Sequence, residues 1–463
     1  MAHLILEVRV EDRKFRPYDQ SQCLLLPPSL REWLPDGHLA VYISDVVDGL
    51  DLRELIADYD SPEGKGAPPY HPRMLLKVLV YGYATGVFSS RKLASRCVED
   101  VGFRYLSAQQ SPDFRTFIKF RSRHIERFRG LFVQVVELSR ELGLVKLGHL
   151  SIDGTKVKAN ASKHKAMSYK RMLSEERKVR DEIDYLLARA GAVDEAEDAR
   201  YGEDGSGESI PAELARREKR LEAIHAARGR LEERARERAE AEAKRREEEA
   251  EERVKSGKRA KRYRKDPDPV PKAKEQENFT DPESRIMRDG ATKGFMQAYN
   301  GQLAVDGSHQ IIVAEELDNN ASDSGKLLGM VDAAAANMGS KPGYVTADGG
   351  YKSERNFAGL DGRKVDGYVA CGREVYDPGI ECPRGRIPRD ATLTDRMARK
   401  LLTKKGRQRY RKRKHTVEPV VGWIKSVLGF RQFSLRGQRK ASGEWALVTT
   451  ALNLRRMAVL CRP

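Results

Sequence analysis

The hydrophobic and polar positions divide the chain into a helical first part, a charged middle part and a last part with strands. Up to about residue 145, apolar residues recur at helical spacing, which predicts helices over residues 71–87, 89–107 and 111–142. Pro72 sits at a first-turn position, and Gly86 breaks the first helix. Ser89 or Ser90 is a natural N-cap for the second helix, and Ser-Pro-Asp opens the third.

The third predicted helix combines an aromatic side with basic side chains. Its apolar residues are Phe114, Phe117, Ile118, Phe128, Phe132 and Val136, and Arg115, Lys119, Arg121 and Arg123 are available to the other sides. Three helices with a basic last member suggest a helix-turn-helix-like module for DNA. A helical bundle with a charged outer face explains the pattern equally well.

From residue 149 onward the pattern changes to short β-type runs mixed with helices. A short strand within 149–159 is expected to end in Asp153-Gly154, and a hairpin over 299–317 turns at Asp306-Gly307. A helix follows with Ser322 as its cap, and a buried-type strand ends at Asp348. The remaining predicted elements are a strand over 367–372 and helices over 416–429 and 444–460. This order predicts an α/β domain with a mixed sheet.

A charged segment separates the first strand from the hairpin. Met172, Val179, Ile183 and Leu186 fall at helical spacing, and Leu214, Leu221, Ile224, Leu231 and Ala235 do likewise. Charges of both signs fill the other positions, which predicts an antiparallel helical hairpin of coiled-coil type. Beyond Ala235 the second helix is almost all Arg, Glu and Ala, and a basic, proline-bearing linker follows it.

Length, net charge, cysteine content and the lengths of the apolar runs limit the classes of protein to which this chain could belong. The chain has 463 residues, so two or three domains are expected. Its formal net charge of +17 favours a polyanionic partner, nucleic acid above all, although a solvated basic surface is the alternative. The 5 cysteines form no CxxC pair, which fits a reducing, cytosolic setting. No apolar run reaches membrane-spanning length, so no membrane association is expected.

Three carboxylates stand out by their positions. Asp153 and Asp348 are expected at strand ends, where ligands of α/β sheets bind, and Glu418 on a helix after the sheet. Two Asp and one Glu suit hard cations, and two such ions can clamp an in-line phosphoryl displacement. Both aspartates precede glycine, so each of them taken alone fits a turn residue better than a metal ligand, and only the context around each favours a ligand.

Most of the chain resembles the DDE transposases of bacterial insertion sequences, in the branch with an InsH-like N-terminal domain. The resemblance rests on the stretches "PYHPRMLLKVLVYGY", "SPDFRTFIKFR", "SIDGTKVKANAS", "NFTDPESRIM", "YNGQLAVD", "TADGGYKSERN", "YRKRKHTVEPVVGWIKSVLGFRQFSLRG" and "EWALVTTALNLRRM". It implies a ribonuclease H-like catalytic domain with a mixed sheet, in which Asp153, Asp348 and Glu418 bind Mg²⁺, with Mn²⁺ as a substitute.

The resemblance also assigns DNA contacts around Glu418. The family has a Tyr and a basic residue before the Glu, and a Lys seven residues after it, where Lys425 stands. Tyr410 and Arg413 keep their mutual spacing, but Arg413 precedes Glu418 by five residues where four is usual, and Lys414 has the spacing of four. Arg115 and Lys119 are the DNA contacts expected in the N-terminal part. Unspecific attraction of phosphate is the alternative for the basic cluster.

These inferences combine into an interrupted two-domain plan. We expect an all-α DNA-binding domain over 1–145, the first catalytic strand over 146–168, the helical hairpin and basic linker over 169–275, and the rest of the catalytic domain over 276–463. The resemblance implies a bacterial, cytoplasmic, nucleoid-associated enzyme that binds the terminal inverted repeats of its element in double-stranded DNA, cleaves the ends and joins them to target DNA. Pairing of two ends implies at least a homodimer.

Two alternatives remain open at this point. A ribonuclease H-like nuclease would cut without joining, and a transposase-derived DNA-binding protein would be catalytically silent. For the hairpin, the alternatives are a role in assembly, a reach along DNA, and a solvated spacer.

Overall fold

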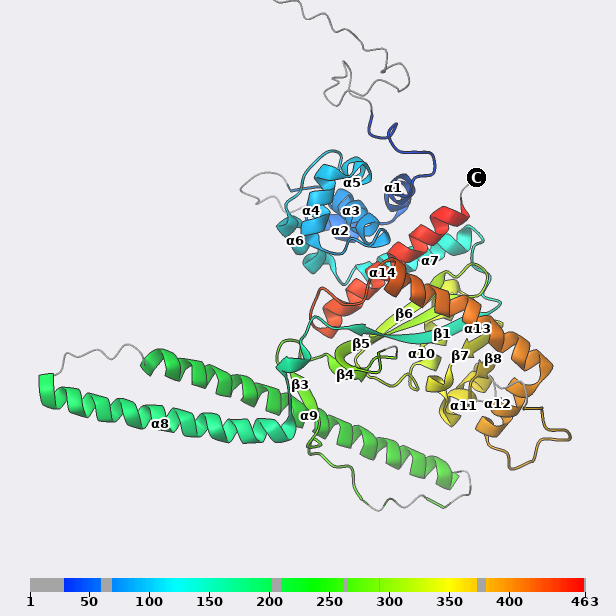
Figure 1. Cartoon of the computed structure of the whole chain (residues 1–463). Coiled ribbons are helices and arrows are strands. Elements are labelled where there is room, and N and C mark those ends of the chain that lie inside the picture. Colours follow the sequence, from blue (N-terminus) through cyan, green and yellow to red (C-terminus); the bar gives the residue numbers. More distant parts are fainter. Residues whose placement is uncertain are drawn as a thin grey trace, which may run out of the picture.

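The computed structural model describes residues 29–59, 69–201, 210–255, 257, 259–260, 263, 265–290, 292–372 and 380–461. The first 28 residues of the predicted N-terminal domain lie outside this range. Figure 1 shows a body of helices around a sheet, with a pair of long helices projecting from it.

Among the described residues, seven helices precede the sheet: α1 (Leu39–Gly49), α2 (Arg53–Ala57), α3 (Pro72–Ala84), α4 (Ser90–Glu99), α5 (Val101–Leu106), α6 (Phe114–His124) and α7 (Phe128–Glu141). The second and third predicted helices are each split in two. The first split falls at Asp100, whose side chain caps α5 by accepting hydrogen bonds from the amides of Gly102 and Phe103. The third predicted helix begins only at Phe114, and its cap is Asp113 and not Ser111, since the Asp113 side chain accepts from the amide of Arg115 at 2.8 Å.

The sheet is mixed, as the sequence predicted. Its strands are β1 (Leu150–Lys158), β4 (Arg285–Arg288), β5 (Phe295–Asp306), β6 (Ile312–Asp318), β7 (Tyr344–Ala347) and β8 (Asp366–Val369). They are ordered β4-β5-β1-β7-β8, and β6 also pairs with β5. The β1–β5, β5–β6 and β4–β5 pairs are antiparallel, whereas β1–β7 and β7–β8 are parallel.

Helices cover both faces of this sheet. They are α10 (Leu327–Met338), α11 (Glu354–Gly362), α12 (Leu393–Leu402), α13 (Lys404–Gly422) and α14 (Gln438–Leu460), with a π-helical turn over Trp423–Val427 after α13. Short 3-10 turns lie at Lys163–Lys165 and Gly349–Tyr351. Ser322 does not cap α10, which begins only at Leu327, because residues 323–326 form a turn closed by a hydrogen bond from Lys326 to Asp323.

One continuous core joins the N-terminal helices to the sheet and to α14. Tyr83 of α3 donates a hydrogen bond to Glu444 of α14 at 2.8 Å, and Arg121 of α6 donates to Tyr83 at 2.9 Å. Arg121 is therefore buried, which corrects the prediction that it lies on an outer side of its helix. Ile118, predicted to lie with the core residues, is instead 42% exposed.

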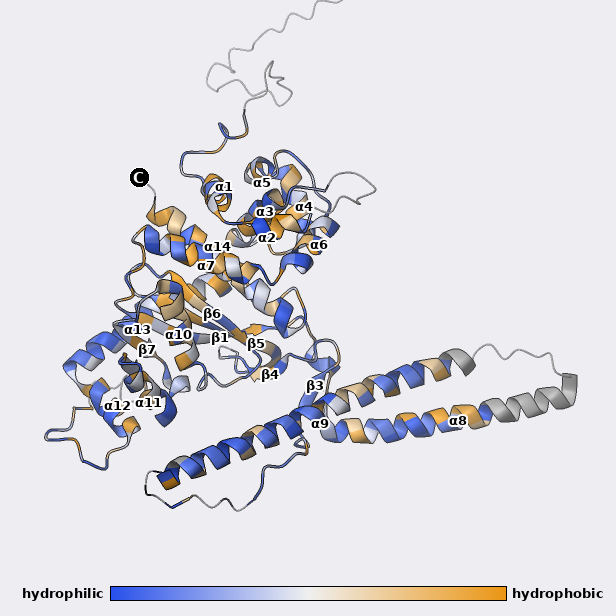
Figure 2. Ribbon diagram, turned by 180° about the vertical axis from the view of Figure 1, so that it is seen from behind, coloured by the Kyte–Doolittle hydropathy of each residue, from blue (hydrophilic) through white to orange (hydrophobic). Residues whose placement is uncertain are grey.

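The insert consists of α8 (Tyr169–Tyr201) and α9 (Ile210–Lys255), with a two-stranded sheet of β2 (Ala166–Ser168) and β3 (Gln276–Asn278) at its base. Figures 1 and 2 show α8 lying along the first half of α9, while the second half of α9 continues past the base in the opposite direction. The surface of the pair is mainly hydrophilic (Figure 2). We call residues 169–275 the arm and the rest of the described chain the body.

Candidate active site

Asp153 is the fourth residue of β1 and does not lie at the strand end that the sequence suggested. The strand continues to Lys158 because β5 pairs with it along its whole length, from Leu150↔Asp306 to Lys158↔Ala298. The parallel pairing with β7, in contrast, ends at Ile152↔Ala347. Asp153 is therefore a strand residue at the point where the parallel pairing stops, and the alternative reading of Asp153-Gly154 as a turn is wrong.

Asp348 directly follows β7 and stands beside Asp153 in the sheet. Since Ile152 pairs with Ala347, the next residue of each parallel strand is one of the two aspartates. The Asp348 carboxylate accepts a hydrogen bond from the amide of Gly350 at 2.9 Å and so caps the 3-10 turn behind it. This second aspartate is both a turn residue and a neighbour of the first.

Glu418 is connected to this pair through Arg413, on the same helix α13. The guanidinium of Arg413 donates from Nη2 to Asp153 Oδ2 at 2.7 Å and from Nη1 to Glu418 Oε1 at 3.1 Å. Arg413 itself is buried. Two carboxylates from distant parts of the chain thus contact one guanidinium, and Asp348 lies beside the first of them.

The pKa of Asp153 is raised to about 6, by burial above all and by nearby Asp348, although Arg413 lowers it in part. One guanidinium therefore does not fully compensate the negative charge that collects here. A bound cation would relieve this charge, because an opposite charge favours the ionised carboxyl.

The basic residues predicted around Glu418 take different positions. Tyr410 is buried and Lys414 is exposed. Lys425 lies in the π-helical turn, where its ammonium donates to the backbone carbonyl of Lys156 at 2.8 Å. Burial lowers the pKa of Lys425. Lys425 is thus held against β1, three residues beyond Asp153, while Arg413 contacts the carboxylates directly.

Arg115 and Lys119 are exposed on α6, on the opposite side from the buried Phe117 and Phe120. The guanidinium of Arg115 lies over the ring of Phe114, 5.5 Å from its centroid. The structure does not bring these two residues to the carboxylates, but it leaves both free to face solvent on a basic helix.

A fourth carboxylate, that of Asp323, was missed by the sequence reasoning. It accepts hydrogen bonds from Asn300 at 2.6 Å and Gln302 at 2.7 Å, and it pairs with Lys156 at 3.3 Å. A Cβ atom added at Gly154 would come closer to Asp323 and Gln302 than side chains tolerate. Gly154 is therefore required for this packing next to Asp153. The only sequence signal was a polar run, "DNNASDSG", which is also typical of an ordinary loop.

The donor set fits a hard divalent cation. In the part of the chain that the structure describes, no three His, Cys, Asp or Glu side chains are close enough as they stand to hold a metal ion. Arg413 occupies the space between Asp153 and Glu418. All three candidate donors are carboxylates, two are adjacent on neighbouring strands, and the Glu418 side chain is 46% exposed, so it is not locked by packing.

Comparison with known families gave two matches. Residues 28–123 match the family model described as a transposase domain (DUF772), and residues 266–454 match that described as a transposase DDE domain. No curated protein and no solved structure matched the chain. With both domains present, the chain belongs to the insertion-sequence DDE transposases. Asp348 and Glu418 lie within the second match, whereas Asp153 lies before it, on the other side of the arm.

Among the described helices, none is long and apolar enough to cross a membrane.

Proposed function

We propose that this transposase cleaves the ends of its element in double-stranded DNA and joins them to target DNA in one site formed by Asp153, Asp348 and Glu418. The observation that carries the proposal is that Arg413 bridges Asp153 and Glu418, which are far apart in sequence, while Asp348 follows the strand beside Asp153. Hydrolysis of a strand exposes a 3′-hydroxyl, and attack of this hydroxyl on target DNA is the same kind of phosphoryl transfer, so one site serves both steps.

The order of the strands supports a ribonuclease H-like catalytic domain. An antiparallel β6-β5-β1 unit continues into parallel β7 and β8, with the first aspartate on the central strand and the second after its parallel neighbour. This arrangement agrees with the resemblance of the sequence. The predicted domain limits of 145, 168 and 275 remain part of the proposal.

Asp153, Asp348 and Glu418 would hold Mg²⁺, or Mn²⁺ in its place. When bound, such ions neutralise the phosphate and activate the attacking oxygen. The residues of this chain orient the site. Asp348 is fixed by the 3-10 turn, Asp153 by the strand, and Arg413 balances the buried charge and can turn to a DNA phosphate. Lys425, held beside β1, and exposed Lys414 would contact the same DNA strand.

The helical N-terminal part would bind the terminal repeats, with Arg115 and Lys119 as phosphate contacts. Replacing both with Ala should weaken binding and make the salt dependence shallower by about one unit of slope per lost phosphate contact. Replacing Arg171 and Lys178 on the arm, which are also exposed, removes the same charge and serves as the control. Unchanged affinity and slope in the α6 variant would place recognition elsewhere.

Asp153→Asn tests the active site. The amide keeps the shape of the side chain but removes its charge, so cleavage of element ends in Mg²⁺ should be abolished while gel-shift binding persists. Asp361→Asn, at an exposed aspartate on α11, is the matched control. Cleavage by Asp153→Asn at a rate comparable to that of the control would remove Asp153 from the site.

A nuclease that cuts without joining is the second candidate, and a strand-transfer assay with pre-cleaved ends separates the two. A catalytically silent DNA-binding protein would show neither activity while still binding the ends. The inverted repeats expected on both sides of the gene provide the natural substrate for these assays.

A further inference from the structure

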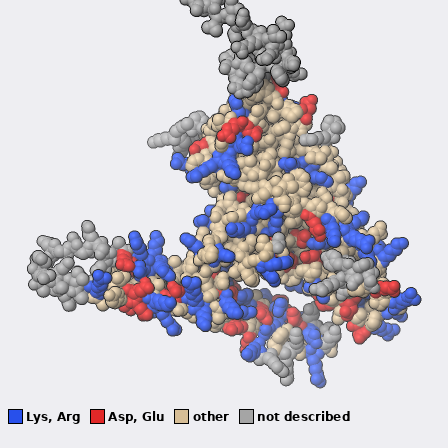
Figure 3. Space-filling view, in the orientation of Figure 1, with Lys and Arg blue, Asp and Glu red and all other residues tan. Residues whose placement is uncertain are grey.

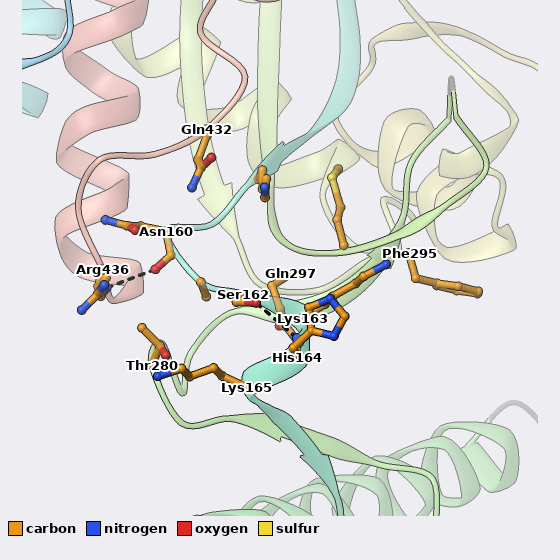
Figure 4. A pocket seen from close by; sticks show the side chains of 13 residues that line it. Asn160, Ser162, Lys163, His164, Lys165, Thr280, Phe295, Gln297, Gln432 and Arg436 are labelled. Atoms are coloured by element: carbon orange, nitrogen blue, oxygen red, sulfur yellow. Dashed lines mark hydrogen bonds between the residues drawn. The ribbon is translucent and has the colours of Figure 1, made fainter.

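A basic pocket lies at the C-terminal end of β1 and contains none of the three candidate ligands Asp153, Asp348 and Glu418. It encloses about 650 Å³, within the roughly 300–1,000 Å³ of small-ligand sites. We call it the β1-end pocket. Figure 4 shows its residues, which come from the end of β1 and the following turn, from β5, and from the segment before α14: Lys158, Asn160, Ala161, Ser162, Lys163, His164, Lys165, Thr280, Phe295, Met296, Gln297, Gln432 and Arg436.

The walls of the pocket are joined by hydrogen bonds between distant segments. Asn160 donates to the carbonyl of Ser434 at 2.7 Å, and Arg436 donates to the carbonyl of Asn160 at 3.0 Å. Lys158 forms a β-bridge with Gln432. On the other side, Asn278 donates to the carbonyl of Ser162 at 2.7 Å. The pocket is therefore held in shape by the fold and does not depend on loose surface side chains.

The charged side chains that line the pocket are all basic. Its lining includes Lys158, Lys163, Lys165 and Arg436, all exposed, and no acidic residue. Among the described residues, no carboxylate forms an ion pair with these four. Like charges this close repel one another, and a polyanion that enters the pocket would relieve the repulsion. Phosphate groups of nucleic acid have the required charge and acceptor oxygens.

The shape of the pocket and the exposed ring of Phe295 indicate whether paired or unpaired DNA fits into it. A duplex presents its phosphates on a convex surface, so it can touch the rim of a pocket but cannot fill it. An unpaired nucleotide can enter. Phe295, at the edge of the pocket, is 62% exposed, and exposed aromatic rings beside cations are how proteins hold unpaired bases.

The pocket also lies at a suitable distance from the carboxylates. Lys158 follows Asp153 by five residues on the same strand, which corresponds to about 17 Å along an extended strand. Successive phosphates of one DNA strand are about 3.4 Å apart along the axis of a duplex, so the pocket is a few nucleotides from the proposed cleavage site.

We propose that the β1-end pocket binds an unpaired stretch of the DNA strand that leads out of the active site, with phosphates on Lys163 and Lys165 and a base on Phe295. This inference rests on the proposed function for the identity of the strand. It adds a binding site for unpaired DNA that is separate from the duplex-binding surface of α6.

Binding of two labelled DNAs of mixed sequence to the full-length protein, in EDTA to prevent cleavage, tests the proposal. One is a blunt duplex, and the other is the same duplex with a short unpaired tail. Lys163→Gln/Lys165→Gln should lose about tenfold in affinity for the tailed DNA only, with a salt slope shallower by about 1.4 for two lost contacts to single-stranded phosphates. Lys178→Gln/Lys219→Gln, on the arm, removes equal charge and should match the wild type.

Phe295→Ala should lower the affinity for tailed DNA by about tenfold, with the salt slope unchanged, because stacking carries no charge. Wild-type affinity for the blunt duplex in each variant verifies that the fold is intact. Equal losses on blunt and tailed DNA, or tailed-DNA binding by the pocket variants equal to that of the arm control, would overturn the proposal.

Cleavage of element ends by the wild type is measured in parallel. Pocket-dependent tail binding without any cleavage would reject the proposed function and leave the pocket, and the reverse pattern would reject the pocket alone.

Discussion

The body and the arm of this transposase are stabilised in different ways. In the body, a single apolar core runs through the N-terminal helices, the sheet and α14. In the arm, a small cluster of Met172, Val179, Ile224, Ala227 and Leu231 lies between α8 and α9. Pairs of opposite charge supplement it, for example Arg217 with Glu182 and Arg220 with Glu175. Figure 3 shows this mixture of charges over the arm.

The two regions therefore differ in the substitutions that they tolerate. In the body, side chains pack closely next to the carboxylates, so small changes in side-chain volume there affect the site. The arm depends on a narrow seam and on exposed ion pairs, which contribute little individually. It is anchored at its base, where buried Glu277 of β3 pairs with Arg230 and Arg234 of α9. Removing the arm should therefore cost the body little.

Replacing the arm tests this independence and has the largest expected effect on function. The amide of Lys170 donates to the carbonyl of Ala273 at 3.2 Å, so the two ends of the arm are adjacent and a short Gly/Ser connection can bridge them. We expect cleavage of single ends to persist and joining of paired ends to be lost, because the arm would support assembly of the two-ended complex. Separate cleavage and joining assays measure this. Wild-type levels of both activities would make the arm a solvated spacer.

Trp445→Ala should cause the largest loss of stability. The Trp445 side chain is fully buried and packs where a side chain at Gly301 would otherwise lie, so its removal leaves a cavity in the body core. The free energy of unfolding should fall by about 3–5 kcal/mol in denaturant titrations. Leu231→Ala, in the arm seam, is the comparison, and its effect should be confined to hydrogen exchange in α8 and α9. Equal global destabilisation by both variants would show that the arm and the body unfold together.

Glu277→Gln should loosen the base of the arm. It removes the charge that two arginines share and should cost about 1–3 kcal/mol, since both arginines are partly exposed and water screens them. Hydrogen exchange should increase in the arm helices and remain unchanged in β1, β5 and β7. Increased exchange in the sheet would mean that the anchor also supports the body.

Glu315→Gln tests whether a buried carboxyl of the body makes the stability of the body depend on pH. Burial on β6 raises the pKa of Glu315 to about 7, Glu316 adds to this and Arg129 of α7 opposes it. The folded state therefore holds a proton that the unfolded state releases near pH 4.5, so wild-type stability should fall as the pH rises from about 4.5 to 7.

Glutamine mimics the protonated form, so the variant should equal the wild type at pH 4 and exceed it by on the order of 1–3 kcal/mol above pH 7. Denaturant titrations across this range measure the difference. A constant difference between the two proteins at all pH values would show that Glu315 ionises normally in the body.

Much of the secondary structure could be predicted because it follows from local rules. The period of the apolar residues marks the long helices, and two β-rich runs around Asp306-Gly307 mark β5 and β6. The seam of the arm could be predicted from the same helical period. The family resemblance, which rests on short stretches along most of the chain, agrees with the matched family models.

Other features of the molecule depend on tertiary contacts and could not be predicted from the local sequence pattern. Asp153-Gly154 is part of a strand because β5 supplies pairing partners beyond it, and no local signal contains that information. Arg121 is buried because Tyr83 and Glu444 offer it polar partners, and Glu444 lies more than 300 residues away in the sequence. The sequence by itself indicated the long helices, the hairpin of β5 and β6, and Asp153, Asp348 and Glu418 as candidate ligands. The contacts of Arg413 with Asp153 and Glu418, and the positions of Asp348, Asp323 and the β1-end pocket, depend on contacts between distant segments, which only the folded chain specifies.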